Sequence, residues 1–233
     1  MRQGFEPLTD ERFRRMNQRL FKEGLALPPN LAQQPATSSP NATTTDKQQA
    51  FARAQQLLDQ ASQLSDQGTA ESQQQALAKY EEALSIWQQL AVNEAPPYVA
   101  HDWEATTLGS IGTIYNLQDD PQKALDYLNQ GLAVRREMKN RLQEAIARAS
   151  ADNTGSNSND QQKLLESYKQ ALASTSLGEA ILLDSVGKVY FNLREIQKAL
   201  EYYNQALSLS QAEKQRSLEA NTLSSIGNVY FQS

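Results

Sequence analysis

The stretch V-G-K-V-Y at 186–190, followed by Q-K-A-L-E-Y-Y-N-Q-A-L at 197–207, decides the fold of this chain because both parts of it recur. The first part returns as I-G-T-I-Y at 111–115 and as I-G-N-V-Y at 226–230, and the second returns as Q-K-A-L-D-Y-L-N-Q-G-L at 122–132. Units that recur in this way cannot bury their apolar faces alone and become stable by stacking on their neighbours. The sequence therefore predicts an array of repeated units.

Each unit is predicted to be a pair of helices, helix A and helix B. Helix A carries a glycine with an aromatic residue three positions later, in the pairs Gly112 and Tyr115, Gly187 and Tyr190, and Gly227 and Tyr230. Helix B carries small, large and small residues at positions i, i+4 and i+7, which lie on one face of a 3.6-residue helix. This pattern predicts four such helices, at Ala76, Tyr80 and Ala83; Ala124, Leu128 and Gly131; Leu164, Tyr168 and Ala171; and Ala199, Tyr203 and Ala206.

The chain is predicted to have three segments. An amphipathic helix segment is expected at 1–26, a flexible linker rich in Pro, Ser, Thr and Gln at 27–48, and the repeat array at 49–233. Within the array we expect repeats at about 54–93, 105–144 and 180–219, a degenerate repeat at 145–179, and helix A alone of a fifth repeat at 220–233.

The repeat at 145–179 is degenerate. Its helix A has Asp152 and Gly155 where the other repeats have the glycine and the aromatic residue, within A-D-N-T-G-S-N-S-N-D, a composition that favours turns. We therefore expect a short, separate helix A at about 142–150, a long polar turn after it, and then the helix B that contains Tyr168.

The N-terminal segment carries Phe13, Met16 and Leu20 on one face of a helix, with arginines on the other faces. One interpretation is a helix that docks on the array or on a neighbouring molecule. The other is a helix that lies on a membrane surface, against which the acidic residues of the segment argue because they dilute its positive charge.

Composition excludes several classes of protein. The net charge of −5 and the pI of about 5.1 argue against a nucleic-acid surface. The absence of cysteine excludes disulfides, thiolate catalysis and zinc–cysteine sites. No apolar run reaches the ~18 residues of a membrane span. The start of the chain lacks the apolar core of a signal peptide, so a cytoplasmic location is expected.

The sequence offers few residues that could form a catalytic site. The single histidine, His101, precedes Asp102, which is expected to cap the next helix, and no Gly-x-Ser-x-Gly elbow presents a nucleophile. Neither a phosphate-binding glycine loop nor a set of metal ligands is visible, so we expect no enzyme, no metal and no cofactor. Trp87 and Trp103 fit either a ligand pocket or helix packing, and packing is the simpler interpretation.

The paired helix A and helix B patterns resemble the tetratricopeptide repeat family. The resemblance covers about 50–233 and implies a right-handed superhelical α-solenoid in which helix A of each repeat lines the concave face. The period of about 40 residues and the motif E-A-x-x-L-x-S-I-G-x-I/V-Y resemble those of the longer-repeat bacterial arrays related to kinesin-light-chain repeats. Such arrays often precede a caspase-like (CHAT) domain, for which this chain offers no catalytic cysteine.

The resemblance also implies that the concave groove binds an extended peptide or a partner protein. The residues expected to face the groove are Thr106, Gly109, Thr113, Asn116, Asp184, Lys188, Phe191, Asn221, Ser224 and Asn228. Asparagine amides form hydrogen bonds with both the N–H and the C=O of an extended backbone, which favours Asn221 and Asn228 as binding residues. The alternative is that these positions are polar only because they are solvated. A second function class, a structural or self-association segment of a larger signalling or protease protein, stays open.

The last predicted helix A carries an apolar stripe made of Leu223, Ile226, Val229 and Tyr230. A stripe of this kind is usually covered by another molecule. We therefore expect self-association through this helix, either by two-fold pairing or by acceptance of the 9–24 helix of a neighbour.

Overall fold

The computed structural model describes residues 44–92, 94, 98–151 and 159–232. The predicted helix segment at 1–26 and all but the last few residues of the predicted linker lie outside this range. By its contacts the chain divides at residue 42, and the unit described is Thr43–Ser233. Within the described residues there are seven α-helices: α2 (Thr44–Asp66), α3 (Ala70–Ala91), α4 (Val99–Leu117), α5 (Pro121–Ala151), α6 (Asn159–Asn192), α7 (Ile196–Ala212) and α8 (Arg216–Gln232).

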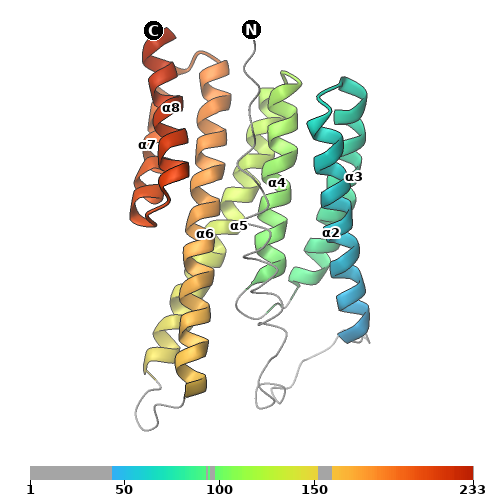
Figure 1. Cartoon of the computed structure of the whole chain (residues 1–233), viewed down its shortest axis with the longest axis vertical. Helices are drawn as coiled ribbons and strands as arrows, with labels where there is room; N and C mark the ends of the chain where they lie inside the picture. The colour runs from blue at the N-terminus through green and yellow to red at the C-terminus, as the bar shows by residue number, and fades with distance from the viewer. Residues whose placement is uncertain (1–43, 93, 95–97, 152–158, 233) are drawn as a thin grey trace. The chain divides into compact units, whose positions relative to one another are not determined.

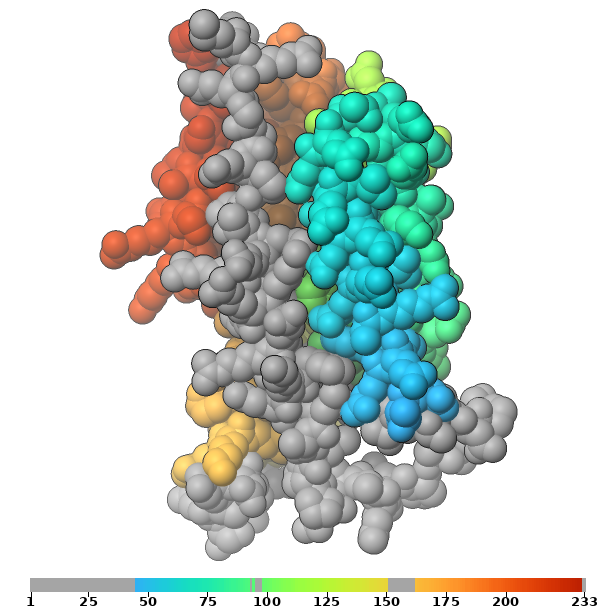
Figure 2. Space-filling view, turned by 45° about the vertical axis from the view of Figure 1, so that its right-hand side comes forward, coloured from blue at the N-terminus to red at the C-terminus, as the bar shows by residue number. Residues whose placement is uncertain are grey.

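These helices pack as consecutive pairs, which confirms the predicted all-α array of the α-solenoid type (Figure 1). α2 packs on α3, α4 on α5 and α6 on α7, and α8 packs on α7. α4 also contacts α6, and α6 contacts α8, so the helices of the A type are neighbours. In Figure 2 the blue-to-cyan helices α2 and α3 and the red C-terminal helices lie on opposite sides of the described residues.

α4 approaches α5 closely at Gly112, and α6 approaches α7 closely at Gly187. A Cβ atom added to Gly112 of α4 would lie 2.8 Å from Cγ of Leu128 on α5. One added to Gly187 of α6 would lie 2.6 Å from Cε1 of Tyr203 on α7. Leu128 and Tyr203 are themselves buried, so each large side chain fills the space that the missing side chain leaves. The glycine of helix A thus pairs with the large residue of the helix B that follows it.

Three of the turns between helices have the same construction. Each contains one residue with a left-handed backbone, and the next amide N–H donates to a carbonyl of the helix that has just ended. The left-handed residues are Asp119 (φ 59°), Arg194 (φ 62°) and Lys214 (φ 54°). The bonds run from the N–H of Asp120 to Tyr115 (2.9 Å), of Glu195 to Tyr190 (2.9 Å) and of Gln215 to Ser210 (2.8 Å). This satisfies carbonyls that a helix end otherwise leaves without partners.

The first turn differs from these three. Gly68 has a φ of 69°, which suits glycine after a helix. Thr69 then caps α3, because its Oγ1 accepts from the N–H of Ser72 at 3.0 Å while Ser72 Oγ accepts from the N–H of Thr69 at 3.1 Å.

The predicted helix boundaries in the degenerate repeat are wrong. The segment 142–150 is not a separate short helix but the continuation of α5, and the helix containing Tyr168 continues without a turn into the helix containing Gly187. The segment 145–179 is thus the far part of one long pair, α5 and α6. The physical reason is that 138–150 contains neither glycine nor proline, so nothing in it stops a helix. Residues 152–158 lie outside the described range.

An apolar cluster stabilises this extension of α5 and α6. Met138 and Leu142 of α5 pack with Ala171 of α6 and with Tyr98, which precedes α4. Burial raises the pKa of the Tyr98 hydroxyl above its usual value. The extension therefore has its own core in addition to the one shared by the repeats.

A row of aromatic rings connects the first three helices. The rings of Phe51 on α2 and Trp87 on α3 meet edge to face at 4.9 Å, and Trp87 stacks on Trp103 of α4 at 5.8 Å. All three side chains are buried. This confirms the interpretation of the two tryptophans as packing residues.

We predict that Lys214→Gly raises the free energy of unfolding by about 0.5–1 kcal/mol. A left-handed backbone costs a non-glycine residue about 1–2 kcal/mol, and the greater entropy that glycine loses on folding offsets about 0.5–1 kcal/mol of the gain. Urea denaturation measures the difference. Glu213→Gly, one residue earlier at a φ of −86°, is the matched control and should lower stability. The same effect from both variants would contradict the strain that we assign to position 214.

Candidate functional site

The ten predicted binding residues lie on α4, α6 and α8, which are the helices of the A type that follow one another in space. A direct bond joins the first two of these helices, since Asn192 Nδ2 of α6 donates to Asn116 Oδ1 of α4 at 3.1 Å. We call the exposed and half-exposed members of the ten the A-helix surface. They are Thr106, Thr113, Asn116, Lys188, Phe191, Asn221, Ser224 and Asn228.

Two of the ten residues are buried and do not belong to this surface. Gly109 faces α6 rather than a groove, because a Cβ atom on it would come within 2.6 Å of Leu182 Cδ2. Asp184 is also buried, and its Oδ2 pairs with Lys188 Nζ at 2.6 Å. Both positions were expected to face the groove, and the structure corrects this, since the close approach of α4 and α6 leaves no space over Gly109.

The pair of Asp184 and Lys188 sets the charge at the centre of this surface. The aspartate side chain is 7% exposed and the lysine side chain 34%, so it is the cation that reaches solvent. Desolvation, and then the negative charge of Asp184, raise the pKa of the Tyr203 hydroxyl far above its usual value. A partner that approaches this surface meets the Lys188 ammonium group, whose positive charge is partly balanced by the buried Asp184 carboxylate.

The polar stripe of α8 is the most accessible part of the A-helix surface. Asn221, Ser224 and Asn228 are spaced i, i+3 and i+7, so they share one helix face, and all three are exposed. Leu218, Thr222 and Val229 of the same helix are buried. The stripe therefore presents amides and a hydroxyl to solvent from a helix that is anchored by its other side.

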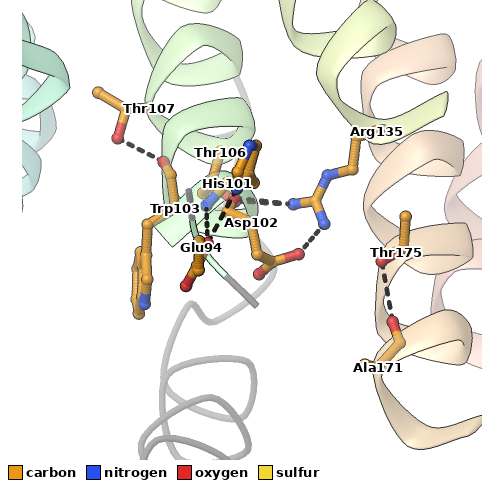
Figure 3. Close-up of polar contacts among 9 residues, drawn as sticks. All are labelled: Glu94, His101, Asp102, Trp103, Thr106, Thr107, Arg135, Ala171 and Thr175. Carbon is orange, nitrogen blue, oxygen red and sulfur yellow. Dashed lines mark hydrogen bonds and ion pairs between the residues drawn. The ribbon is translucent and has the colours of Figure 1, made fainter. Parts of the chain in front are cut away.

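A buried polar junction lies beside this surface and was not predicted from the sequence. Arg135 of α5 reaches the start of α4, where its Nη1 donates to Asp102 Oδ1 and its Nη2 donates to Thr106 Oγ1 at 2.8 Å (Figure 3). The arginine side chain is 2% exposed and the aspartate 8%. Buried charges of this kind are stable only when they are paired and hydrogen-bonded.

α6 completes the junction. Gly178 lies against the Arg135 guanidinium, so that any side chain at this position would collide with it. The next residue, Glu179, is buried and accepts from Arg136 Nε at 3.1 Å and from Lys139 Nζ at 3.3 Å. Charges from α4, α5 and α6 thus meet at one level of the array.

The sequence did contain a signal for this junction. The buried stripe of helix B in α5 runs through Ala124, Leu128 and Gly131 and continues to position 135, where it meets an arginine. A charged residue in an otherwise apolar stripe indicates a buried partner, and Asp102 supplies it.

The start of α4 also differs from the prediction. Asp102 does not cap this helix, because the helix already begins at Val99. Glu94 takes the role instead: its carboxylate accepts from the N–H of Ala100 at 2.8 Å. It also accepts from the N–H of His101 at 3.2 Å (Figure 3). The same carboxylate lies 2.9 Å from His101 Nδ1. The histidine is therefore part of a helix start, and the described residues contain no group of three or more acidic, histidine or cysteine residues that could hold a metal ion.

Comparison with known families identifies the repeats. Residues 71–137 match one tetratricopeptide repeat model and residues 181–213 match a second. The chain contains tetratricopeptide repeats. The first match covers α3, which is the second helix of the α2–α3 pair, then α4 and the first half of α5. The second match covers the end of α6 and all of α7. Both matches are to repeats and neither is to a catalytic domain.

Comparison with curated proteins gave no match. Tetratricopeptide repeats indicate a role in protein–protein interaction and do not name the partner. Among the described residues, no helix is long and apolar enough to cross a membrane.

We predict that Arg135→Met lowers the free energy of unfolding by about 3–5 kcal/mol, because it leaves the Asp102 carboxylate buried without its cation. The double variant Asp102→Leu with Arg135→Met should recover most of this loss, since apolar residues of similar volume replace a buried pair at little cost. Urea denaturation of both variants measures the effect. A single variant as stable as the wild type would show that the pair does not hold α5 to α4.

Glu104 of α4 generates a prediction about pH. Burial raises the pKa of its carboxyl above the usual value, and the side chain of Gln88 on α3 acts in the opposite direction through a hydrogen bond. The charged form is therefore less stable in the folded protein. This penalty is present above the folded pKa and is absent below the unfolded pKa of about 4.3.

Glu104→Gln should accordingly raise the melting temperature at pH 7, and the gain should disappear as the pH falls to about 4. Glu201→Gln is the control, because Glu201 is exposed on α7 and its replacement should change stability by no more than about 0.5 kcal/mol. A gain from Glu104→Gln that is the same at both pH values would contradict a cost of burying the charge.

Proposed function

We propose that the chain is a protein-interaction scaffold that binds an extended peptide or a partner protein on its A-helix surface. The observation that carries the proposal is the polar stripe of α8, where Asn221, Ser224 and Asn228 are all exposed on one face of a helix anchored on the opposite side. Asparagine side chains both donate and accept, as an extended backbone requires. The occurrence of tetratricopeptide repeats supports the same class of function.

The remaining members of the surface extend this stripe toward α4. Lys188 contributes a partly exposed cation and Phe191 a half-buried aromatic ring. Thr113 contributes an exposed side chain whose hydroxyl donates to the Gly109 carbonyl at 2.9 Å. A peptide with a carboxylate near an apolar side chain is the ligand that suits this combination. Backbone pairing at α8 then sets the position of the peptide along the surface.

The chain is proposed to belong to the long-repeat bacterial type related to kinesin-light-chain repeats, acting in the cytoplasm without a catalytic role of its own. The alternative function is a structural, self-association or regulatory part of a larger signalling or caspase-like (CHAT) protein. The exposed apolar residues of α8, Leu223 and Tyr230, favour that alternative.

We predict that Asn221→Ala combined with Asn228→Ala weakens binding of the partner at least tenfold. The partner is first identified by capture on the immobilised full chain and mass spectrometry, and its affinity is then measured by isothermal titration calorimetry. Because both residues are exposed, the circular dichroism spectrum and the melting temperature should remain nearly unchanged.

The matched control replaces two exposed asparagines on helices of the B type, Asn129→Ala with Asn204→Ala, and should leave the affinity within about twofold. Equal losses in the two double variants, or a loss in the control alone, would place the binding site away from the A-helix surface.

A further inference from the structure

The exposed apolar residues of α8 occupy the positions at which α4 packs on α5 and α6 packs on α7. The pattern leucine, glycine four residues later and tyrosine three residues after that occurs as Leu108, Gly112 and Tyr115; as Leu183, Gly187 and Tyr190; and as Leu223, Gly227 and Tyr230. The leucine is 2% and 1% exposed in the first two sets and 48% exposed in the third, where the tyrosine is 69% exposed. We call the third set the α8 stripe.

The glycine of each set shows what is different. Gly112 lies beneath Leu128 of α5, and Gly187 lies beneath Tyr203 of α7. A Cβ atom on Gly227 would have no heavy atom within 4 Å. The α8 stripe therefore has the same space beside its glycine as the other two helices, and we call this space the notch. No side chain fills the notch of α8 among the described residues.

The packing of α8 on α7 does not use this stripe. The sequence predicts that Val229 belongs to an apolar stripe that another molecule covers, and this is wrong for Val229. It lies on another face of α8 and is buried in a cluster with Ala199 and Tyr203 of α7. The stripe consequently remains available while α8 is held in place.

The two occupied sets define the helix that fits. In each of them, a tyrosine of the B helix stacks on the tyrosine of the set, and a lysine of the same B helix lies over that ring. The stacked pairs are Tyr115 with Tyr127 (5.5 Å) and Tyr190 with Tyr202 (5.4 Å). The lysines are Lys123, 5.0 Å from the Tyr115 ring, and Lys198, 5.1 Å from the Tyr190 ring.

We propose that the α8 stripe is a docking site for an amphipathic helix that carries lysine, alanine one residue later, tyrosine four residues later, leucine or tyrosine five residues later, and a small residue eight residues later. The leucine or tyrosine fills the notch over Gly227, and the tyrosine stacks on Tyr230. The lysine then lies over the Tyr230 ring as a cation–π contact. This site is separate from the polar stripe formed by Asn221, Ser224 and Asn228.

A second copy of this chain fits the site less well. Its own α8 would offer Gly227, Tyr230 and Phe231 in the places of Ala199, Tyr202 and Tyr203 of α7. It would place Ile226 where α7 has Lys198, so the cation over the tyrosine ring would be lost.

The test uses a fluorescein-labelled peptide with the sequence of residues 195–213, which contains the α7 helix. A lactam bridge between Glu201 and a lysine that replaces Gln205 keeps it helical, because both positions are exposed on α7. Fluorescence anisotropy with the full chain should show saturable one-to-one binding. Gly227→Leu in the chain should weaken this binding at least tenfold by filling the notch, and Tyr203→Ala in the peptide should do the same.

Gly227→Leu changes an exposed position in a helix and should not prevent folding, which circular dichroism checks. Asn228→Ala in the chain is the control and should leave peptide binding within about twofold, while it weakens the partner of the polar stripe. Three results would overturn the proposal: no binding of the peptide to the wild-type chain, equal binding to the Gly227→Leu variant, or sedimentation as a dimer that the peptide does not dissociate. Binding of a peptide of residues 9–24, but not of residues 195–213, to the same face would overturn it as well.

Discussion

The close approach of helix A to helix B at a glycine is the constraint on which this array depends. Where α4 carries Gly112 and α6 carries Gly187, the following helix inserts Leu128 or Tyr203 into the space of the missing side chain. The depth of that insertion fixes the distance between the paired helices, and with it the level at which Tyr115 and Tyr190 meet the rings of the B helices. Protein interiors are packed densely enough that a change at one such contact displaces its neighbours. The turns and the outer aromatic stacks follow from this geometry.

Between these two pairs the array departs from uniform repetition. α5, with 31 residues, and α6, with 34, are longer than the other described helices, which have 17 to 23 residues. Their extension forms an apolar cluster at Met138, Leu142 and Ala171. At the base of the extension, Arg135 is directed into α4 and Gly178 of α6 leaves room for it. The two spans that match tetratricopeptide repeats, 71–137 and 181–213, lie on either side of this extension. The contacts of Arg135 with Asp102 and with Gly178 join α5 to both α4 and α6.

Much of the fold could be predicted from the sequence because its determinants are local. The spacing of Ala199, Tyr203 and Ala206 defines a helix face, and Gly68 with Thr69 defines a turn, without knowledge of distant residues. The continuity of α5 could not be predicted from the repeat register, since the register of a degenerate unit says nothing about where a helix stops. The exposure of the predicted site residues could also be predicted only in part. Asn221 and Asn228 are exposed, as predicted. Gly109 is buried by a contact with Leu182 that depends on how two repeats pack. Contacts between repeats are set by packing, and a pattern within one repeat does not contain them.

The buried ion pair between Asp102 and Arg135 has a consequence for cooperativity. In a simple array each repeat contacts only its neighbours, and the ends can open while the centre stays folded. Here one guanidinium contacts α4 and lies against α6 while belonging to α5, so none of the three helices can separate without exposing a buried charge. The central helices should therefore exchange their amide hydrogens as a single unit, at a slower and more uniform rate than α8. We expect the junction to keep the three central helices together while α8, which has no such ion pair in the part of the chain that the structure describes, opens first.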